Sequence, residues 1–241
     1  MKKFIFAIIL ALSAVSLQAQ TAAKPTPSNI PSGVPVKQGT KATVVTPKVE
    51  VDPGILSGNI YTHVGLGFDI TFPESWVIPG LDTEKYWKEK GYELRPKINR
   101  NDPQQAANIR RYEKQVTLLL TAYRSAIGTP KNAILLISAE DLSTNPKVKD
   151  AVDYFDLMRA QLGTMKLPAD YEYSVTQAER LGAQQFGFLD ITTAKEKKRL
   201  YATVRDGYAI ILAFTYHEAA DLAAFRRIIE EANFSLRTQN K

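Results

Sequence analysis

Few residues of this 241-residue chain have the type and spacing that catalysis requires. The sequence contains no cysteine and only two histidines, His63 and His217. Without cysteine there is no disulfide, thiol nucleophile, thiolate metal site or lipid anchor on cysteine. A zinc site takes three or four protein ligands, so two isolated histidines do not supply one. We expect each histidine to lie in a capping or surface position.

One pair of neighbouring carboxylates, Glu140 and Asp141, follows an apolar run and is the remaining candidate for acid–base chemistry. Solvated loop residues show the same pattern, and we favour that interpretation. The lone G-x-G at Gly65 and Gly67 precedes a strand, which indicates a turn and not a dinucleotide site. No G-x-S-x-G motif and no Walker-type lysine motif occurs. The sequence therefore predicts no catalytic residue, no metal site and no cofactor.

The segment 79–101 interleaves aromatic and basic residues. Aromatic anchors with a charged rim are typical of interface centres. We therefore predict five binding residues there: Tyr86, Trp87, Tyr92, Arg95 and Lys97. The alternative is that the rings pack beneath their own loop as a small separate core.

The start of the chain has the features of a secretory signal peptide. Lys2 and Lys3 precede an apolar run over 4–15, and the polar residues Gln18, Gln20 and Thr21 end it. Cleavage is expected after Ala19, although Leu17 is larger than the residue usually found at that position before the cleaved bond. This run is too short to span a membrane, which takes roughly 20 residues. We expect removal of residues 1–19 and a periplasmic or secreted protein with no membrane span after cleavage. An uncleaved N-terminal anchor is the alternative.

Composition divides the remaining chain into a linker and one domain. Residues 20–57 contain six of the 13 prolines and no aromatic residue, which predicts a disordered linker rich in Pro, Thr and Lys. Within it, Val44–Val45 and Val49–Val51 are candidates for a short edge strand. Residues 58–241 are predicted to form a single globular domain.

Hydrophobic patterning within that domain predicts strands joined by hairpins and helices in blocks. The strongest signal is Asp206-Gly207 between two β-rich runs, which favours a type I′ hairpin. The expected strands are 60–62, 68–72, 76–78, 118–124, 133–139, 171–176, 184–192, 200–205 and 208–216; the expected helices are 82–90, 102–114, 145–162 and 221–232. This order is typical of the α+β class with a mainly antiparallel sheet.

The charge balance is mildly basic. The formal charge is +6, and loss of Lys2 and Lys3 leaves 6 − 2 = +4. This excess does not indicate a nucleic-acid partner. The basic run 195–199 is either a polyanion site or a solvated hairpin tip, and we favour the tip.

Two stretches resemble the PsbP-like domain family. The run from Tyr61 to Trp76 is similar to that family's opening, with a Gly-Phe strand and a Phe-Pro-x-x-Trp motif, and 201–234 is similar to its closing hairpin and helix. The tail Asn233-Phe234-Ser235 departs from the family's Ser-x-x-Phe-like ending, and 79–117 has no counterpart. The family includes photosystem II extrinsic subunits, a Ran-binding nuclear import factor and exported bacterial proteins. The resemblance implies an antiparallel sheet flanked by helices on both faces, an α/β/α sandwich, and no set of catalytic residues.

Two functions from different classes remain open. The first is an exported, soluble, non-catalytic binding or assembly module whose partner is an envelope protein or an anionic polymer. The second is a periplasmic enzyme that uses carboxylates such as Asp141. A deep pocket with converging polar groups would favour the enzyme, and a shallow apolar patch would favour the binding module. The sequence does not define the oligomeric state.

The export prediction has a direct test. Because the short apolar run 4–15 follows a basic start, we expect the exported protein to begin near Gln20. N-terminal sequencing of the exported product checks this. A membrane-bound product that retains Met1 would contradict it.

Overall fold

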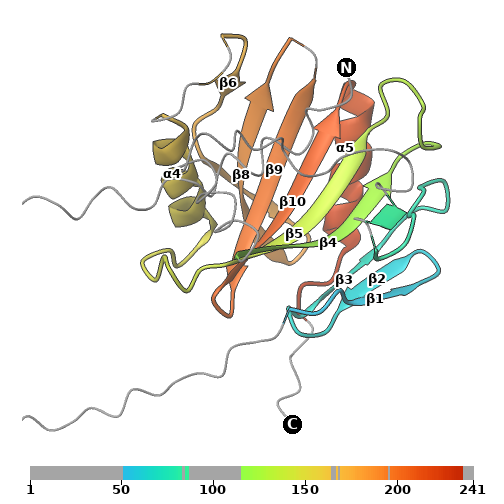
Figure 1. Cartoon of the computed structure of the whole chain (residues 1–241), viewed down its shortest axis with the longest axis horizontal. Coiled ribbons are helices and arrows are strands. Elements are labelled where there is room, and N and C mark those ends of the chain that lie inside the picture. The colour runs from blue at the N-terminus through green and yellow to red at the C-terminus, as the bar shows by residue number, and fades with distance from the viewer. Residues whose placement is uncertain are drawn as a thin grey trace, which may run out of the picture.

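The computed structural model describes residues 51–82, 85–86, 115–163, 167, 169–194 and 196–235. These residues form two antiparallel sheets and two helices (Figure 1). The elements are β1 (Ile55–Ser57), β2 (Ile60–His63), β3 (Phe68–Thr71), β4 (Val116–Tyr123), β5 (Ile134–Asp141), α4 (Ala151–Leu162), β6 (Glu172–Tyr173), β7 (Gln177–Leu181), β8 (Gln184–Thr192), β9 (Lys197–Arg205), β10 (Tyr208–Tyr216) and α5 (Ala219–Glu231). The predicted α+β class with antiparallel sheets is confirmed.

The larger sheet has the order β4-β5-β10-β9-β8-β6, with β7 also paired to β8. Its β9–β10 hairpin turns through Asp206 and Gly207, whose φ angles are 50° and 79°. Two residues with positive φ are what a type I′ turn requires, so the predicted hairpin is confirmed. In this arrangement β10 lies between β9 and β5 and is paired along its length on both edges.

The two faces of β10 belong to two different hydrophobic clusters. Ile210, Leu212 and Phe214 lie in one cluster together with α5 residues such as Phe225, whose ring stacks on Phe214 at 4.3 Å between centroids. The alternate residues of β10 lie in a second cluster together with the apolar side chains of α4: Ala209, Ile211 and Ala213 with Tyr154, Phe155, Met158 and Leu162. The period of two along a strand therefore gives each helix its own set of partners.

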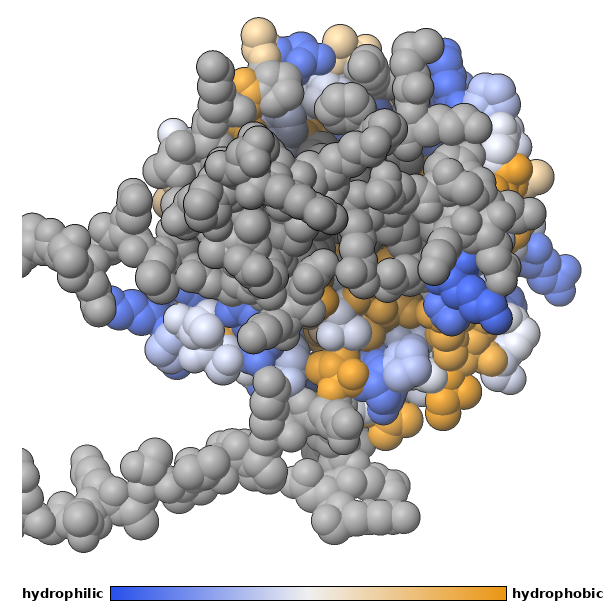
Figure 2. All heavy atoms as spheres, viewed as in Figure 1, coloured by the Kyte–Doolittle hydropathy of each residue, from blue (hydrophilic) through white to orange (hydrophobic). Residues whose placement is uncertain are grey.

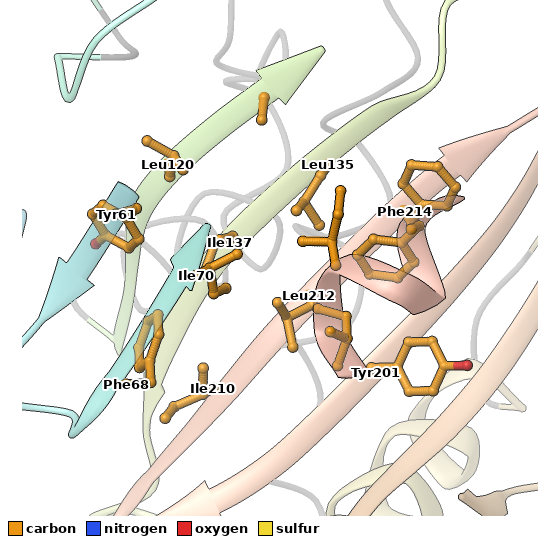
Figure 3. Packing of buried hydrophobic residues seen from close by; sticks show 14 of the residues in the cluster. Tyr61, Phe68, Ile70, Leu120, Leu135, Ile137, Tyr201, Ile210, Leu212 and Phe214 are labelled. Carbon is orange, nitrogen blue, oxygen red and sulfur yellow. The ribbon is translucent and has the colours of Figure 1, made fainter. Parts of the chain in front are cut away.

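The smaller sheet, β1-β2-β3, packs one of its faces into the first cluster. Tyr61 from β2 and Phe68 and Ile70 from β3 are fully buried. Figure 3 shows these three side chains near those of β4, β5 and β10. Thus the smaller sheet and α5 contribute to the same core.

The residues after α5 connect the two sheets. Asn233 pairs with Asp69 of β3 through two backbone hydrogen bonds of 2.9 and 3.0 Å. The next residue, Phe234, stacks on Phe68 at 5.6 Å and meets Phe186 of β8 edge-on at 5.1 Å. The Arg205 guanidinium donates to the backbone oxygens of Gly67, at 2.7 Å, and of Phe234. One short segment thereby contacts both sheets.

Several local expectations differ from the structure. β1 begins at Ile55, within the stretch assigned to the linker. Around 76–78 there is only an isolated bridge, Val77 to Tyr123. α4 begins at Ala151, not near 145, because the Asp150 carboxylate accepts the backbone N–H groups of Val152 and Asp153 as an N-cap. The predicted helix 102–114, the residues 1–50 and most of the predicted helix 82–90 lie outside the described residues.

β7 was not predicted at all. Its sequence, QAERL, has no β-branched residue, and only Leu181 is buried. Its pairing with β8 therefore comes from the register of the neighbouring strand and from the turn at Gly182, where φ is +57°.

Trp76 is a core residue, as its position after Phe72-Pro73 predicts. It is 7% exposed and packs 5.8 Å from Phe72 and 6.3 Å from Phe214, centroid to centroid. We expect Trp76→Ala to cost about 3–5 kcal/mol of unfolding free energy, measured by urea titration. The matched control is Val175→Ala, because Val175 is 62% exposed; it should change stability by about 0.5 kcal/mol or less. An unchanged midpoint for Trp76→Ala would contradict the core assignment.

Candidate functional site

Only one of the five predicted binding residues lies in the described part of the chain. Tyr86 is half-buried and packs against the small cluster of Tyr123 and Ile134, together with Val77 and Ile127. Trp87, Tyr92, Arg95 and Lys97 lie outside the described residues. The structure therefore does not bring the five together, and their role as a binding surface stays a prediction.

The carboxylates Glu140 and Asp141 point to opposite faces of the larger sheet, because they are consecutive in β5. Glu140 lies on the α4 side, where its Oε2 accepts a 2.7 Å hydrogen bond from the Tyr154 hydroxyl. Asp141 instead accepts the backbone N–H of Ser143 at 2.9 Å. The two side chains therefore do not converge as an acid–base pair.

The pKa of Glu140 is nevertheless raised. Burial raises the pKa, the hydrogen bond from Tyr154 opposes the shift, and the charge of Asp141 adds to it. Because perturbed carboxylates concentrate at functional sites, Glu140 is the one described residue that favours the enzyme hypothesis.

A second polar network lies on the α5 side of the larger sheet. Arg199 of β9 makes two 2.7 Å hydrogen bonds to the carboxylate of Asp190 on β8, its register partner. The guanidinium also lies 4.4 Å from the centroid of the Phe188 ring. Next along β9, the Tyr201 hydroxyl donates a 2.6 Å hydrogen bond to Glu179 of β7. Each ionic group here has a partner within the sheet.

The described residues of the basic run, 196–199, do not form a solvated hairpin tip. β9 begins at Lys197, so Lys198 and Arg199 lie within a strand. Lys198 is 4% exposed and its Nζ lies 2.7 Å from the Glu196 carboxylate. Ion pairing inside the sheet therefore disfavours the polyanion interpretation for Lys198 and Arg199.

Both histidines serve local structure. His63 is fully buried, and its Nδ1 accepts the backbone N–H of Leu66 at 3.1 Å while its Nε2 lies 2.9 Å from the backbone oxygen of Asp52. The ring thus caps the turn after β2, in agreement with the predicted capping role. His217 precedes α5, and its backbone N–H donates to Asp221 at 3.2 Å. Among the described residues, no group of His, Asp and Glu could hold a metal ion.

Asp221 fixes the start of α5. Burial alone would raise its pKa, but hydrogen bonds from the backbone N–H groups of Glu218 and His217 and from the Arg124 side chain hold the pKa below its ordinary value. An ionised carboxylate in the first turn also interacts favourably with the positive end of the helix dipole. Asp221 is therefore a structural residue.

The candidate functional site is an exposed apolar patch on the outer face of the smaller sheet, made of Ile55, Ile60 and Val64. Their exposures are 60%, 42% and 52%. Ile55 lies opposite Thr62, and Ile60 lies two residues before Thr62 in β2, so both isoleucines share the face opposite Tyr61. Val64 directly follows β2. Figure 2 shows hydrophobic residues gathered where this sheet lies, on the lower part of the visible surface.

Sequence reasoning missed this patch for an identifiable reason. Alternation along 60–62 places Ile60 and Tyr61 on opposite faces, so one of the two must face outward. The signal was present in β2. Ile55, which lies on the neighbouring strand β1, falls in the stretch expected to be a linker. The sequence therefore indicated one exposed isoleucine on this face and not two.

Several solved structures are similar to the chain, and two of them cover about three quarters of it. One is the solution structure of cyanobacterial PsbP (CyanoP) from Synechocystis sp. PCC 6803, at 12% identity and a TM-score of 0.39, covering 75% of this chain and 95% of that chain. The other is the crystal structure of LpqN, involved in cell envelope biogenesis of Mycobacterium tuberculosis, at 13% identity and a TM-score of 0.38, covering 76% and 85%. No protein-family profile and no curated protein sequence matches the chain.

The PsbP-like resemblance seen in the sequence is thus met again among solved structures. Structural similarity at these identities and TM-scores does not indicate what the chain binds or does. The strands and helices of the chain form an α+β domain with antiparallel sheets. No described helix is long and apolar enough to cross a membrane.

The raised pKa of Glu140 gives a pH-dependent prediction. A carboxyl group whose pKa is higher in the folded than in the unfolded state favours folding below its unfolded pKa of about 4.3, and this contribution is lost as the pH rises through the folded pKa. Glu140→Gln keeps an acceptor for Tyr154 and cannot ionise. We therefore expect the variant to become progressively more stable than the natural protein as pH rises from 4 to 8.

Urea unfolding across that pH range measures the difference. The control is Glu172→Gln, since Glu172 is an exposed carboxylate of β6. Its stability should follow that of the natural protein at every pH. A Glu140→Gln curve parallel to the natural one would refute a raised Glu140 pKa.

Proposed function

We propose that this protein is an exported, non-catalytic binding or assembly module that contacts its partner through the patch of Ile55, Ile60 and Val64. The observation that carries the proposal is the exposure of these three aliphatic side chains on the outer face of the smaller sheet. Contiguous apolar surface is unfavourable in water unless another surface covers it, and such patches mark interaction sites. The rim of that contact would consist of polar residues on the same face, Ser57, Thr62 and Thr71.

The use of the charged residues supports a non-catalytic role. Arg199, Arg226, Arg124 and Lys198 each pair with a carboxylate, and Arg205 is held by backbone oxygens. Groups that are fully used in holding strands and helices together are poorly placed to bind and transform a substrate. We propose an envelope protein as the partner because the patch is apolar; an anionic polymer at exposed lysines such as Lys131, Lys147 and Lys149 is the alternative.

Finer aspects of the proposal rest on different observations. The α/β/α arrangement is supported by the division of β10 residues between the α4 and α5 clusters. Export is supported by the sequence of residues 1–19. A second binding surface at Trp87, Tyr92, Arg95 and Lys97, beside Tyr86, is supported by their composition. No nucleic-acid partner is proposed.

The alternative function, a periplasmic enzyme that uses a carboxylate, is favoured by one observation, the raised pKa of Glu140. Against it stands the position of Asp141 on the other face of the sheet. A reaction at Glu140 would therefore need a second catalytic group from elsewhere, because its sequence neighbour does not reach the same side.

The binding proposal predicts a separation of binding from stability. Ile60→Ser removes an exposed apolar side chain, so unfolding free energy should change by only about 0.5 kcal/mol. Recovery of partners from a native envelope fraction by the immobilised protein should fall severalfold, because one of the three apolar side chains of the contact has become polar. Quantitative mass spectrometry of the recovered proteins measures this.

The matched control is Val175→Ser. Val175 is 62% exposed but lies between β6 and β7, outside the patch. It should recover the same partners as the natural protein. Equal recovery by the natural protein, Ile60→Ser and Val175→Ser would defeat the assignment of the patch.

A further inference from the structure

We propose that the outer face of the smaller sheet selects a cationic partner, a protein segment that presents aliphatic side chains together with Lys or Arg on one face. This proposal rests on the proposed function, because it names the chemistry of the partner for the same patch. The aliphatic side chains of the partner cover Ile55, Ile60 and Val64. Its lysine or arginine side chains meet the carboxylates beside them.

The stretch of chain that forms the patch is acidic, although the whole chain is basic. Residues 51–82 contain four carboxylates, Asp52, Asp69, Glu74 and Asp82, and neither Lys nor Arg, so their formal charge is 0 − 4 = −4 with histidine neutral. The formal charge of the whole chain is +6. The acidic stretch includes all of β1, β2 and β3. The field of this sheet therefore attracts a cationic surface and repels an anionic one.

Asp69 is the carboxylate that shares the outer face with the patch. It lies opposite Thr62 of β2, which lies opposite Ile55 of β1, so the three side chains form one row across the sheet. Neighbouring strands are about 4.8 Å apart, which places Asp69 about 10 Å from Ile55 along the row. Figure 2 shows strongly hydrophilic residues beside the hydrophobic ones on this part of the surface. One short segment can therefore cover the isoleucine and reach the carboxylate.

The charge of Asp69 has no cationic partner among the described residues. Its Oδ2 accepts a 3.1 Å hydrogen bond from the neutral side-chain amide of Asn233. The nearby Arg205 guanidinium donates instead to the backbone oxygens of Gly67 and Phe234. An ionised carboxylate has about four acceptor sites. Asp69 can therefore accept a charge-assisted hydrogen bond from a lysine or arginine of the partner.

Glu74 places a second carboxylate at the other end of the patch. It is exposed and lies two residues after Phe72, whose backbone N–H donates to the backbone oxygen of Asn59 at 2.8 Å. Asn59 directly precedes Ile60, so Glu74 follows the sheet at the end where Ile60 lies. The patch thus has one carboxylate in the row of Ile55 and another beyond Ile60.

The same charges disfavour other occupants. In a symmetric dimer both copies present the same face, which brings two acidic surfaces together. An anionic lipid or polymer is repelled for the same reason. A standard interface between two proteins buries roughly 800 Å² on each partner, which three partly exposed aliphatic side chains do not provide. Attraction between opposite charges therefore has to support a contact of this size.

Defined peptides test this choice of partner. Three short fluorescein-labelled peptides of alternating sequence, Leu-Lys, Leu-Glu and Ser-Lys, are titrated with the full chain, and fluorescence anisotropy measures their binding. The Leu-Lys peptide alone combines apolar side chains with positive charge. We expect it to bind at least tenfold more tightly than either of the others in about 0.1 M salt, and more weakly in about 1 M salt, where charges are screened beyond roughly 3 Å.

A double variant, Asp69→Asn with Glu74→Gln, locates the contact. It removes two charges and keeps an acceptor for the Asn233 amide. We expect its affinity for the Leu-Lys peptide to fall about threefold or more and to depend less on salt. The matched control, Asp170→Asn with Glu172→Gln, removes two exposed carboxylates at β6 and should bind like the natural protein. Urea unfolding verifies that both double variants are folded.

The remaining outcomes each overturn the proposal. Equal affinity for the Leu-Lys and Leu-Glu peptides shows that charge does not select the partner, and equal affinity for Leu-Lys and Ser-Lys shows that the patch takes no part. Unchanged binding by the double variant at Asp69 and Glu74 places the cationic contact elsewhere.

Failure of this proposal is distinguishable from failure of the proposed function. If the peptides show no preference while Ile60→Ser still loses envelope partners, the patch binds a partner that is not selected by positive charge. If no peptide binds and Ile60→Ser recovers the same partners as the natural protein, the proposed function itself fails.

Discussion

The contact of Phe234 with Phe68 and Phe186 is the point on which the arrangement of the two sheets depends. Phe234 is 5% exposed and lies between a ring from β3 and a ring from β8. It is placed there by the backbone pairing of Asn233 with Asp69 and by the Arg205 guanidinium. Burying an aromatic ring of this size contributes about 1.5–3 kcal/mol. Because these bonds join β3, β9 and the end of α5, the smaller sheet has a fixed position on the larger one.

That fixed position determines which side of the smaller sheet meets water. Tyr61 and Phe68 face the common core, so the alternating residues must face outward, and two of them are isoleucines. The strand pattern of β2 thus combines an inner face that holds the sheet in place with an outer face suited to a contact.

The elements recognised from sequence are those whose signal is local. Asp206-Gly207 defines its own turn geometry, and the alternation of β10 is strong enough to identify a strand without its neighbours. β7 carries no such signal, because its pairing depends on β8. The start of α4 was misplaced since Asn145-Pro146 and Asp150 are both plausible caps, and only the hydrogen bonds of Asp150 distinguish them.

The candidate site was only partly predictable, for the same reason. The separation of Glu140 and Asp141 follows from strand alternation once β5 is known to include both residues, but the expected strand ended at 139. The pairing of Arg199 with Asp190 depends on the register of β8 and β9, which the sequence of either strand does not define. The predicted aromatic and basic residues of 79–101 were chosen by composition, which identifies a type of surface but not its neighbours. Ile55 needed the register of β1 with β2 to join Ile60.

Two cationic side chains of β9 are largely buried in this domain, and a few aliphatic side chains of the smaller sheet are exposed. Lys198 and Arg199 are largely buried within strand pairs, whereas Ile55 and Val64 are more than half exposed. A buried ion pair contributes little net stability, because desolvation offsets most of the attraction, but its geometry disfavours a shifted strand register. The Arg199–Asp190 pair therefore favours the observed register of β9 with β8. The smaller sheet is held by other contacts, those of Phe234 and Arg205, and a surface held rigidly would lose less conformational freedom in the proposed contact than a mobile one.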